Sequence, residues 1–345
     1  MRMTIRTDAS DSIGAGHFTR CLALADRVAA LGGRVRFLAN QAHPVITGAL
    51  AERAHALLVL NLPEGASPED DAQASARALE SECDWLVVDH YGLDDRWETS
   101  LRERARNVLV IDDLADRCHD CDILVDPGYG RDGANYAGLV PPPAELLLGS
   151  RFALLKHTFA AHHDAAPPSP ERRRVHVFFG SGAATMRWLA QYCEWLLDAL
   201  PDIQVCAVGR GDRKAMQALG QRHAARLEWQ EQVDDMAAHM ATCDVAVGSP
   251  GSATWERACV GLASALVATS ENQVPVLRVL DGARFCRFLG SVWDLDAARF
   301  TTGVAAFLDD RDALAGMRAR GVAAVDGRGV DRVVRRLAKQ EHGLD

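Results

Sequence analysis

The chain has 345 residues and a formal net charge of −9. Its apolar content of 48% and charged content of 25% are close to the averages for soluble globular proteins, which disfavours disordered, collagen-like and disulfide-scaffold classes. A chain of this length exceeds one ordinary hydrophobic core, so we expect about two domains. The negative net charge disfavours a nucleic-acid partner, but a helix N-terminus can still bind a phosphate group.

The nine cysteines are odd in number and scattered along the chain. This pattern is typical of reduced thiols in a cytosolic protein. No apolar run approaches the roughly 18 residues that suggest a membrane-spanning helix, and the N-terminus lacks the pattern of a signal peptide. We therefore expect a cytoplasmic protein, without a membrane partner, that acts as a monomer on a small molecule.

The first half of the chain alternates strand and helix patterns. Residues 3–7 read as a short strand, and apolar residues recur at helical spacing over 17–31. Residues 35–39 form a second strand pattern. Three continuous apolar runs follow, each ending in an aspartate, as is typical of strands buried on both faces of a parallel sheet. These runs are residues 85–89, 108–112 and 123–126.

A proline-rich stretch separates the two halves, and we place a linker at residues 156–172 between domains at 1–155 and 173–345. The strand and helix rhythm then restarts, with strands expected at 175–179, 204–208, 245–247 and 262–268. The fold class is therefore α/β, with two Rossmann-like domains. Two such halves joined by a hinge predict a central cleft, which is a common position for a ligand site.

The loop before the first helix carries Gly14, Gly16 and His17. A dinucleotide fingerprint would have a third glycine where Thr19 stands and an acid where Asn40 ends the second strand. A nicotinamide or flavin cofactor is therefore not expected, and the glycines can simply serve a tight turn. His17 is either a hydrogen-bonded residue at the helix start or a general base.

Acidic residues surround this histidine in the sequence. Asp8 and Asp11 share its loop and could orient the ring. Further acids end the buried strands, as in Asp89-His90-Tyr91-Gly92 and Asp112-Asp113, where ordinary turn roles compete with functional ones. Adjacent aspartates are more typical of turns than of a metal site, and no paired set of Cys and His with zinc spacing occurs. We expect no metal.

The second half has a stronger signal at residues 248–257. A buried strand enters a glycine–serine turn that starts a helix, so free N–H groups and the positive helix end together favour an anion. Glu256 could reach the hydroxyl pair of a ribose. The alternative is a capping motif in which Glu256 and Arg257 form an ion pair. The segment lacks the Gly-Lys-Ser/Thr of a P-loop.

These motifs together resemble one family. The opening run resembles that of the UDP-2,4-diacetamido-2,4,6-trideoxy-β-L-altropyranose hydrolases of pseudaminic acid biosynthesis. Later segments follow in the family's order over nearly the whole chain. The matching positions are Arg6, Asp8, Ser10, Ile13, Gly14, Gly16, His17, Arg20, Cys21, Leu22, residues 89–92, Asp112, Asp113, Gly149, Leu154, Ser252, Thr254, Trp255, Glu256 and residues 271–273.

The resemblance implies a GT-B arrangement whose C-terminal domain holds UDP, and a metal-independent, inverting hydrolysis of the sugar–UDP bond. It implies that His17 activates water, that Tyr91 and Asn272 line the sugar and diphosphate region, and that Glu256 holds the ribose. The catalytic candidates are His17, Asp8 and Tyr91. The candidate substrate- and UDP-binding residues are Gly14, Gly16, Arg20, Gly180, Ser181, Gly251, Ser252, Thr254, Glu256, Asn272 and Gln273.

Two segments depart from the family pattern. Residues 179–182 lack the first glycine and the acid usual after the first strand of the second domain, and Pro250 removes one N–H from the later loop. A UDP-sugar-dependent glycosyltransferase would need the same parts and an acceptor pocket, so fold alone does not separate the two enzymes. A nucleotide-sugar-binding protein without turnover is the third hypothesis.

Overall fold

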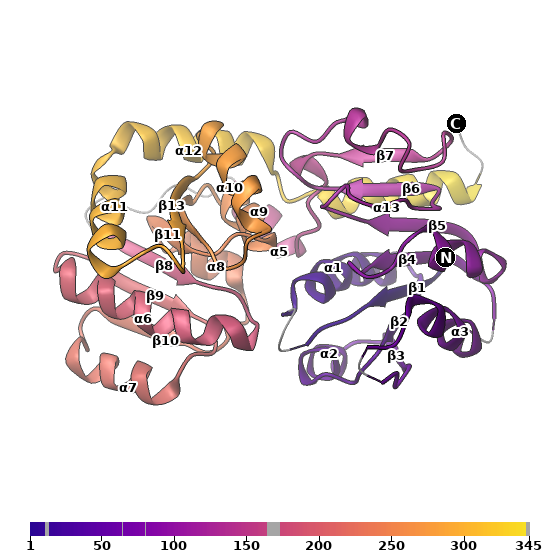
Figure 1. Cartoon of the computed structure of the whole chain (residues 1–345), viewed down its shortest axis with the longest axis horizontal. Helices are drawn as coiled ribbons and strands as arrows, with labels where there is room; N and C mark the ends of the chain where they lie inside the picture. Colours follow the sequence, from indigo (N-terminus) through magenta and orange to yellow (C-terminus); the bar gives the residue numbers. More distant parts are fainter. Residues whose placement is uncertain (11–13, 64, 80, 164–172, 343–345) are drawn as a thin grey trace. The chain divides into compact units, whose positions relative to one another are not determined.

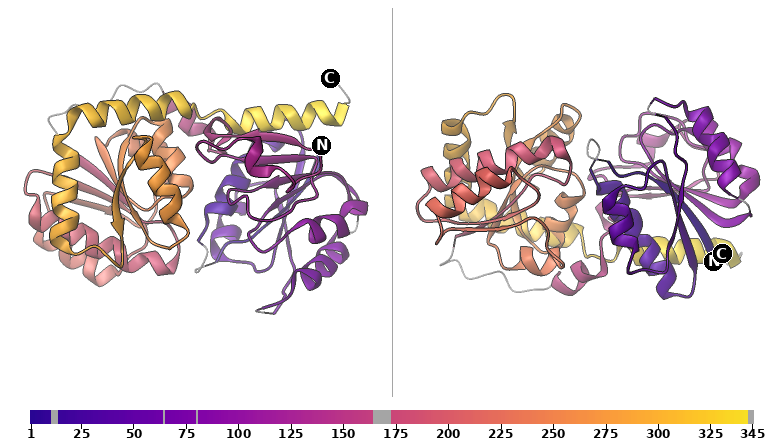
Figure 2. Two further views of the ribbon diagram at one scale, coloured as in Figure 1. Left: turned by 45° about the horizontal axis from the view of Figure 1, so that its top comes forward. Right: turned by 90° about the horizontal axis from the view of Figure 1, so that it is seen from below.

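The structure, a computed structural model, describes residues 1–10, 14–63, 65–79, 81–163 and 173–342. The chain divides into two compact units, Met1–Leu155 with Arg328–Asp345, and Lys156–Gly327. In each unit a central parallel sheet has helices on both faces (Figures 1 and 2). The predicted α/β class with two parallel-sheet domains is confirmed.

The sheet of the first unit has seven strands in the order β3-β2-β1-β4-β5-β6-β7. The predicted apolar runs form its centre, while the short, partly exposed β3 and β7 were not predicted. Its strands are β1 (Arg2–Thr7), β2 (Arg34–Ala39), β3 (Ala56–Val59), β4 (Cys83–Asp89), β5 (Ala105–Ile111), β6 (Ile123–Asp126) and β7 (Glu145–Leu148). Its helices are α1 (Gly16–Ala30), α2 (Pro44–Leu50), α3 (Pro68–Ala78), α4 (Asp95–Ser100) and α13 (Gly329–His342).

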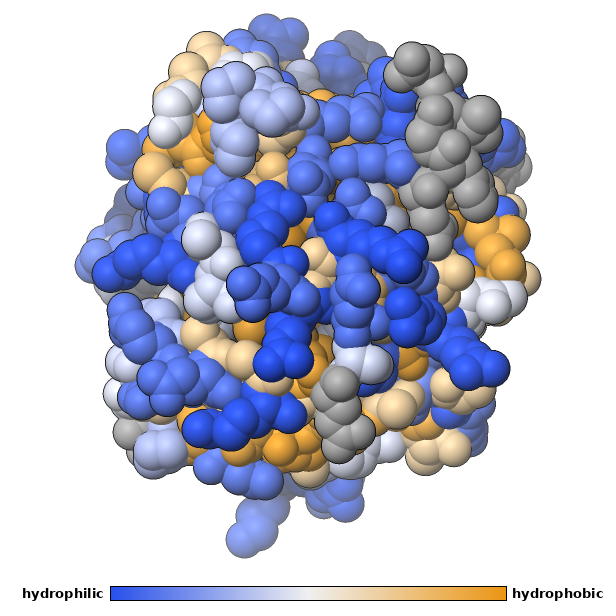
Figure 3. Space-filling view, turned by 90° about the vertical axis from the view of Figure 1, so that its right-hand side faces the viewer, coloured by the Kyte–Doolittle hydropathy of each residue, from blue (hydrophilic) through white to orange (hydrophobic). Residues whose placement is uncertain are grey.

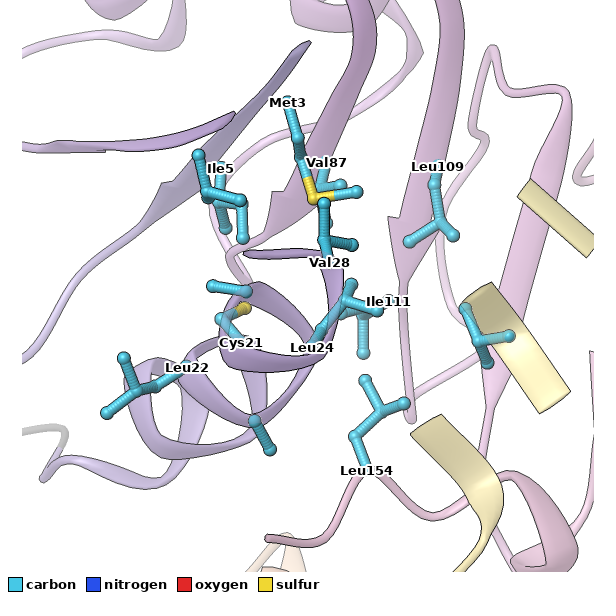
Figure 4. Close-up of a cluster of buried hydrophobic side chains, with 14 of the residues drawn as sticks. Met3, Ile5, Cys21, Leu22, Leu24, Val28, Val87, Leu109, Ile111 and Leu154 are labelled. Atoms are coloured by element: carbon cyan, nitrogen blue, oxygen red, sulfur yellow. The ribbon is translucent and has the colours of Figure 1, made fainter. Parts of the chain in front are cut away.

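Helix α1 covers the middle of this sheet with the apolar stripe that the sequence predicts. Cys21, Leu24 and Val28 are buried one helical turn apart. They face Ile5 of β1 and Val87 of β4 in one cluster (Figure 4). This packing fixes the start of α1, and the loop before it, at the carboxyl edge of β1.

The C-terminal helix α13 belongs to the first unit, whereas the sequence-based boundary placed residues 173–345 in the second. Its buried residues Val330, Val333, Val334 and Leu337 recur at helical spacing and complete the core beneath α1. The boundary differs because the amphipathic pattern shows that a helix buries one face without showing which core receives it. Of the expected linker, residues 157–162 form helix α5 (His157–His162), and residues 164–172 lie outside the described residues.

The second unit repeats the plan with six parallel strands in the order β10-β9-β8-β11-β12-β13. Its strands are β8 (Arg174–Phe178), β9 (Gln204–Val208), β10 (Leu227–Gln230), β11 (Val245–Gly248), β12 (Ala263–Ala268) and β13 (Arg287–Ser291). Its other helices are α6 (Ala183–Ala199), α7 (Arg213–Arg222), α8 (Met236–Ala241), α9 (Ser252–Cys259), α10 (Gln273–Gly282), α11 (Ala297–Asp309) and α12 (Arg311–Ala324). The outer strands β10 and β13 were not predicted.

Among the described residues, no helix combines the length and hydropathy that a membrane span requires. The molecular face drawn in Figure 3 is mostly hydrophilic, with apolar side chains scattered between polar ones. Such scattering is normal for a protein surface and marks no extended apolar patch on that face.

Candidate active site

Both sheets reverse their strand order at one point, and ligands of open α/β sheets bind at the carboxyl edge of such a point. In the first unit the reversal lies between β1 and β4, and in the second between β8 and β11. The strand register sets Thr7, the last residue of β1, beside Asp89, the last residue of β4. The loop that carries His17 therefore opens next to Asp89.

His17 and Asp89 form a close pair at this edge. The Nδ1 atom of His17 lies 2.5 Å from Oδ1 of Asp89, which is buried. An ionised carboxylate only accepts hydrogen bonds, so the contact with Asp89 assigns the ring proton to Nδ1; Nη2 of Arg20 also lies 3.2 Å from Nδ1 but donates to Asp89 over 2.7 Å. No described residue hydrogen-bonds Nε2, and this nitrogen carries the free lone pair. The pair has the arrangement of a general base held by a carboxylate.

Arg20 holds the same carboxylate from one turn further along α1. Its Nε and Nη2 atoms donate to the two oxygens of Asp89, each over 2.7 Å. Its Nη1 atom donates to Asp113 over 2.7 Å. Burial opposes both charges, but the Asp89 and Asp113 carboxylates raise the pKa of Arg20, and the Arg20 guanidinium holds the pKa of Asp89 well below its usual range. Asp89 is therefore charged at neutral pH, and bidentate bonding fixes its orientation.

The Tyr91 ring packs against the ring of His17. The two rings meet edge to face with centroids 4.5 Å apart. The Tyr91 hydroxyl donates to Asp113 over 2.9 Å, and burial beside that carboxylate raises the pKa of the phenol far above neutrality. Tyr91 is thus a neutral hydrogen-bonding and packing group, not a base. The structure brings His17, Arg20 and Tyr91 together, and the Arg20 side chain that was predicted to bind substrate contacts Asp89 and Asp113.

Asp8 does not orient His17, contrary to the expectation from its position in the loop. One carboxylate oxygen of Asp8 lies 2.9 Å from Nη1 of Arg6, and the other lies 3.4 Å from Nε2 of His90. The backbone N–H of Asn40 also donates to Asp8 over 2.7 Å. These contacts lower the pKa of Asp8. Asp11 lies outside the described residues.

A cavity of about 570 Å³ lies beside these groups, within the first unit. Arg6, Asp8, Asn40, Asp71 and His90 contribute its polar lining. Its size suits a small molecule. His17, Arg20 and Tyr91 are not among its lining residues, whereas Asp8 and His90, which contact each other, are.

The other candidate residues of the first unit have structural roles. Gly14 adopts a φ of +75° and pairs with Ser10 through the backbone, which only a residue tolerant of positive φ does without strain. Gly16 is the first residue of α1. Asp112 accepts hydrogen bonds from the N–H of Ala115 and from the Tyr136 hydroxyl, in agreement with the turn interpretation.

The second unit presents two glycine-bearing loops at its reversal point. Gly180 follows β8 with a φ of +102°, and Gly251 precedes α9 with a φ of +101°. A side chain on Gly248 would lie 1.8 Å from the carbonyl oxygen of Phe178. The ends of β8 and β11, just before the two loops, therefore leave no room for a Cβ atom at Gly248. Ser181 and Ser252 continue the two loops into their helices.

Arg257 and Glu256 do not form the ion pair that the capping alternative requires. The buried Arg257 guanidinium donates to the carbonyl oxygens of Ser249 and Phe178, over 2.8 and 3.1 Å. The Arg257 side chain therefore connects the segment after β11 to the last residue of β8. Burial lowers the pKa of Arg257 to about 10, and burial raises that of Glu256. No described residue hydrogen-bonds the Glu256 carboxylate.

The remaining candidate residues of the second unit differ in the hydrogen bonds that they make. The Oγ1 atom of Thr254 is buried and has no partner among the described residues. Asn272 is exposed before α10, and Ser270 donates to its side-chain oxygen over 2.6 Å. Gln273 instead accepts from the backbone N–H of Thr269 over 2.8 Å. The Gln273 carbonyl oxygen therefore stabilises the turn that leads into α10.

Sequence reasoning missed two members of the first site. Asp89 and Asp113 were noted as strand-end acids but were not assigned to His17 or Arg20. The signal was present, since both acids end strands expected in one parallel sheet. Selecting Asp89 required the order β1-β4-β5, which brings residues 72 apart in the chain into contact.

Among known proteins, no family model matches the chain. Over 160 residues, 46% of this chain, it is 28% identical to the UDP-2,4-diacetamido-2,4,6-trideoxy-β-L-altropyranose hydrolase of Campylobacter jejuni, and it spans about half (53%) of that protein.

Two solved structures cover almost the whole chain. MurG of Acinetobacter baumannii superposes with a TM-score of 0.66 at 14% identity, covering 98% of this chain and 100% of that one. The UDP-GlcNAc 2-epimerase of Neisseria meningitidis, solved bound to UDP-GlcNAc, gives 0.62 at 9% identity, with 98% and 100% covered. The chain has the two-domain α/β fold of these proteins, the GT-B fold.

Proposed function

We propose that this protein hydrolyses a UDP-linked 2,4-diacetamido-2,4,6-trideoxyhexose to the free sugar and UDP. The observation that carries the proposal is the pairing of His17 with the buried, ionised Asp89, which leaves Nε2 of His17 available as a base. The likeness to the Campylobacter jejuni hydrolase supports the choice of substrate class.

In the proposed reaction, Nε2 of His17 removes a proton from water as the water oxygen attacks the anomeric carbon. The bond between that carbon and the diphosphate oxygen breaks, UDP leaves with the electron pair, and the configuration inverts. Asp89 stabilises the imidazolium that forms, and Arg20 holds Asp89 in place. UDP is a good leaving group, so the step needs little acid assistance and no metal in this scheme.

The second unit would supply the nucleotide site. The loop before α9 presents backbone N–H groups at the positive end of the helix, where the charge on the leaving diphosphate is stabilised. Glu256 has a carboxylate without a hydrogen-bond partner among the described residues, so both oxygens are available to ribose hydroxyls. The position of Glu256, one turn into α9, supports that role.

The test is incubation of the purified chain with the UDP-diacetamido sugar alone, with UDP release as the readout. The proposal predicts stoichiometric UDP and free sugar without any acceptor, and much slower release from UDP-GlcNAc. Release that strictly requires an added acceptor would instead indicate a glycosyltransferase. Tight UDP binding with no release from any sugar of this class would indicate a binding protein.

A further inference from the structure

A cluster of histidine and cysteine side chains lies in the second unit, and the proposed hydrolysis does not use it. His176 on β8 and Cys206 on β9 are register partners, so both project from the same face of the sheet. His239 lies on α8, and Cys243 follows it by four residues, about one helical turn. Sheet and helix therefore bring two imidazoles and two thiols together.

The distances within this cluster are short. The candidate ligand atoms of His176, His239 and Cys243 all lie within 4.8 Å of one another. The two imidazole rings have centroids 5.2 Å apart. The thiol of Cys206 interacts with that of Cys243 and also donates to Glu228 over 3.7 Å, so Cys206 is a fourth candidate beside this group of three. All nine cysteines of the chain are free thiols in the structure.

The imidazoles lack the hydrogen bonds that buried histidines normally make. His176 is fully buried, and neither of its ring nitrogens has a partner among the described residues. Nε2 of His239 is also buried without a partner there. A buried polar atom without a hydrogen bond destabilises the fold. One ion would satisfy one nitrogen of His176 and Nε2 of His239 together, beside the two thiols.

We propose that His176, Cys206, His239 and Cys243 bind one Zn²⁺ ion in a structural site. Two histidines and two cysteines are a common ligand set for tetrahedral structural zinc. Zinc with these ligands sets its donor atoms about 3.3–3.8 Å apart. Closing the group of His176, His239 and Cys243 from within 4.8 Å thus takes side-chain movements of about 1 Å, and the Cys206 thiol would turn from Glu228 to join them.

The charge and the surrounding groups also suit this ion. Two thiolates and two neutral imidazoles balance the charge of Zn²⁺, which lowers the cost of burying it. Arg174 and Glu228 flank the thiols but neutralise each other in an ion pair of 2.8 Å.

Such an ion would join strands β8 and β9 to helix α8. The site lies on the sheet itself and not at the carboxyl edge that carries the glycine loops, so the inference is independent of the proposed hydrolysis. Its expected effect is on the stability of the second unit. The readouts are therefore metal content and thermal unfolding, neither of which depends on activity.

The experiment uses the reduced, metal-stripped full chain, titrated with Zn²⁺ against a chromophoric chelator. We expect one ion per chain and a rise in the unfolding temperature on adding Zn²⁺. Cys243→Ala and His176→Gln should each weaken binding about 100-fold or more, since loss of an outer contact alone costs 10- to 100-fold. Co²⁺ in place of Zn²⁺ should show thiolate charge-transfer absorption that Cys243→Ala diminishes.

Two substitutions serve as controls. Cys193→Ala removes another buried thiol from the same unit, and Cys118→Ser removes an exposed one, so both should leave Zn²⁺ affinity unchanged. If His176→Gln does not fold, Cys243→Ala tests the same ligand set. Absence of stoichiometric Zn²⁺ binding, full affinity in Cys243→Ala, or a disulfide between Cys206 and Cys243 that replaces the metal would each overturn the proposal.

Discussion

The carboxyl edges of the two sheets occupy the same topological position but are built from different groups. In the first unit the edge is made of charged side chains, with Arg20 joining Asp89 and Asp113 beside His17. In the second unit it is made largely of backbone: Gly180 and Gly251 have positive φ, and the Arg257 guanidinium donates to the carbonyl oxygens of Ser249 and Phe178.

This difference separates two kinds of chemistry. A general base needs a fixed partner that holds its tautomer, and the charged edge supplies one. A diphosphate needs close approach of backbone N–H groups, and glycines at a helix start allow that approach. We therefore propose that proton transfer belongs to the first unit and nucleotide binding to the second.

The largest effect is expected from His17→Asn. Removing the base should lower kcat by about 10³-fold or more, within the range typical of general-base catalysis. UDP affinity, measured by calorimetry, should stay at the wild-type value because the nucleotide would bind the other unit. Loss of UDP binding in parallel with activity would contradict the division.

The next largest effect should distinguish Asp89 from Asp8. Asp89→Asn leaves the shape of the site but removes the charge that stabilises the imidazolium, so kcat should fall about 10²- to 10³-fold. Asp8→Asn is the matched control in the same unit, because its carboxylate contacts Arg6 and His90 instead of His17. Equal losses in the two variants would argue against Asp89 as the partner of His17.

Leu337→Ala tests the assignment of α13 to the first unit. Leu337 is fully buried in that core, and its truncation should lower the free energy of unfolding by about 2–5 kcal/mol. Hydrogen exchange followed by mass spectrometry should show faster exchange in β1 and β4 and unchanged exchange in β8 and β11. The reverse pattern would place the helix with the second unit.

Glu256→Gln tests the nucleotide side. Loss of the carboxylate should weaken UDP binding about 10- to 100-fold, the value of a charged hydrogen bond of about 1.5–3 kcal/mol, with little change in kcat. Because burial raises the pKa of Glu256 above its usual 4.5, the wild-type carboxyl takes up its proton at a higher pH than an exposed glutamate does. Wild-type UDP affinity should therefore fall more steeply than that of the variant as pH decreases toward about 5. Parallel pH curves would count against the role of Glu256.

The smallest effect is expected from Gly251→Ala. The added methyl group meets no atom within 4 Å, so the cost comes only from the φ of +101°. We expect the free energy of unfolding to fall by about 1–3 kcal/mol, which would lower the unfolding temperature. If the loop rearranges instead, UDP binding should weaken. Gly248→Ala, which adds a clash with the carbonyl of Phe178, should be more damaging in the same assays. Full stability and affinity in Gly251→Ala would show that the loop does not need its observed backbone.

Much of the fold could be predicted because buried parallel strands are continuous apolar runs. The sequence patterns that form β4, β6 and β9 are of this kind. The outer strands β3, β7, β10 and β13 are short and partly exposed, so their patterns resemble loops. Local periodicity also could not show that α13 returns to the first core after the chain has formed the second unit.

The candidate sites were predictable to the extent that their residues are neighbours in sequence. His17 and the loop before α9 were found from local patterns. The Asp89 partner lies 72 residues from His17, and its selection depended on strand order. The ligands of the proposed zinc site escaped detection for the same reason, since His176, Cys206 and His239 are on separate elements and only His239 and Cys243 are close in sequence.

The most direct test of the central claim is hydrolysis of the UDP-diacetamido sugar in water enriched in ¹⁸O. Water activated by His17 attacks the anomeric carbon in this account, so the label should appear in the anomeric hydroxyl of the free sugar and not in UDP. Mass spectrometry of both products within the first turnovers would measure this before anomeric exchange. Label in the phosphate of UDP would show attack at phosphorus and would contradict the mechanism.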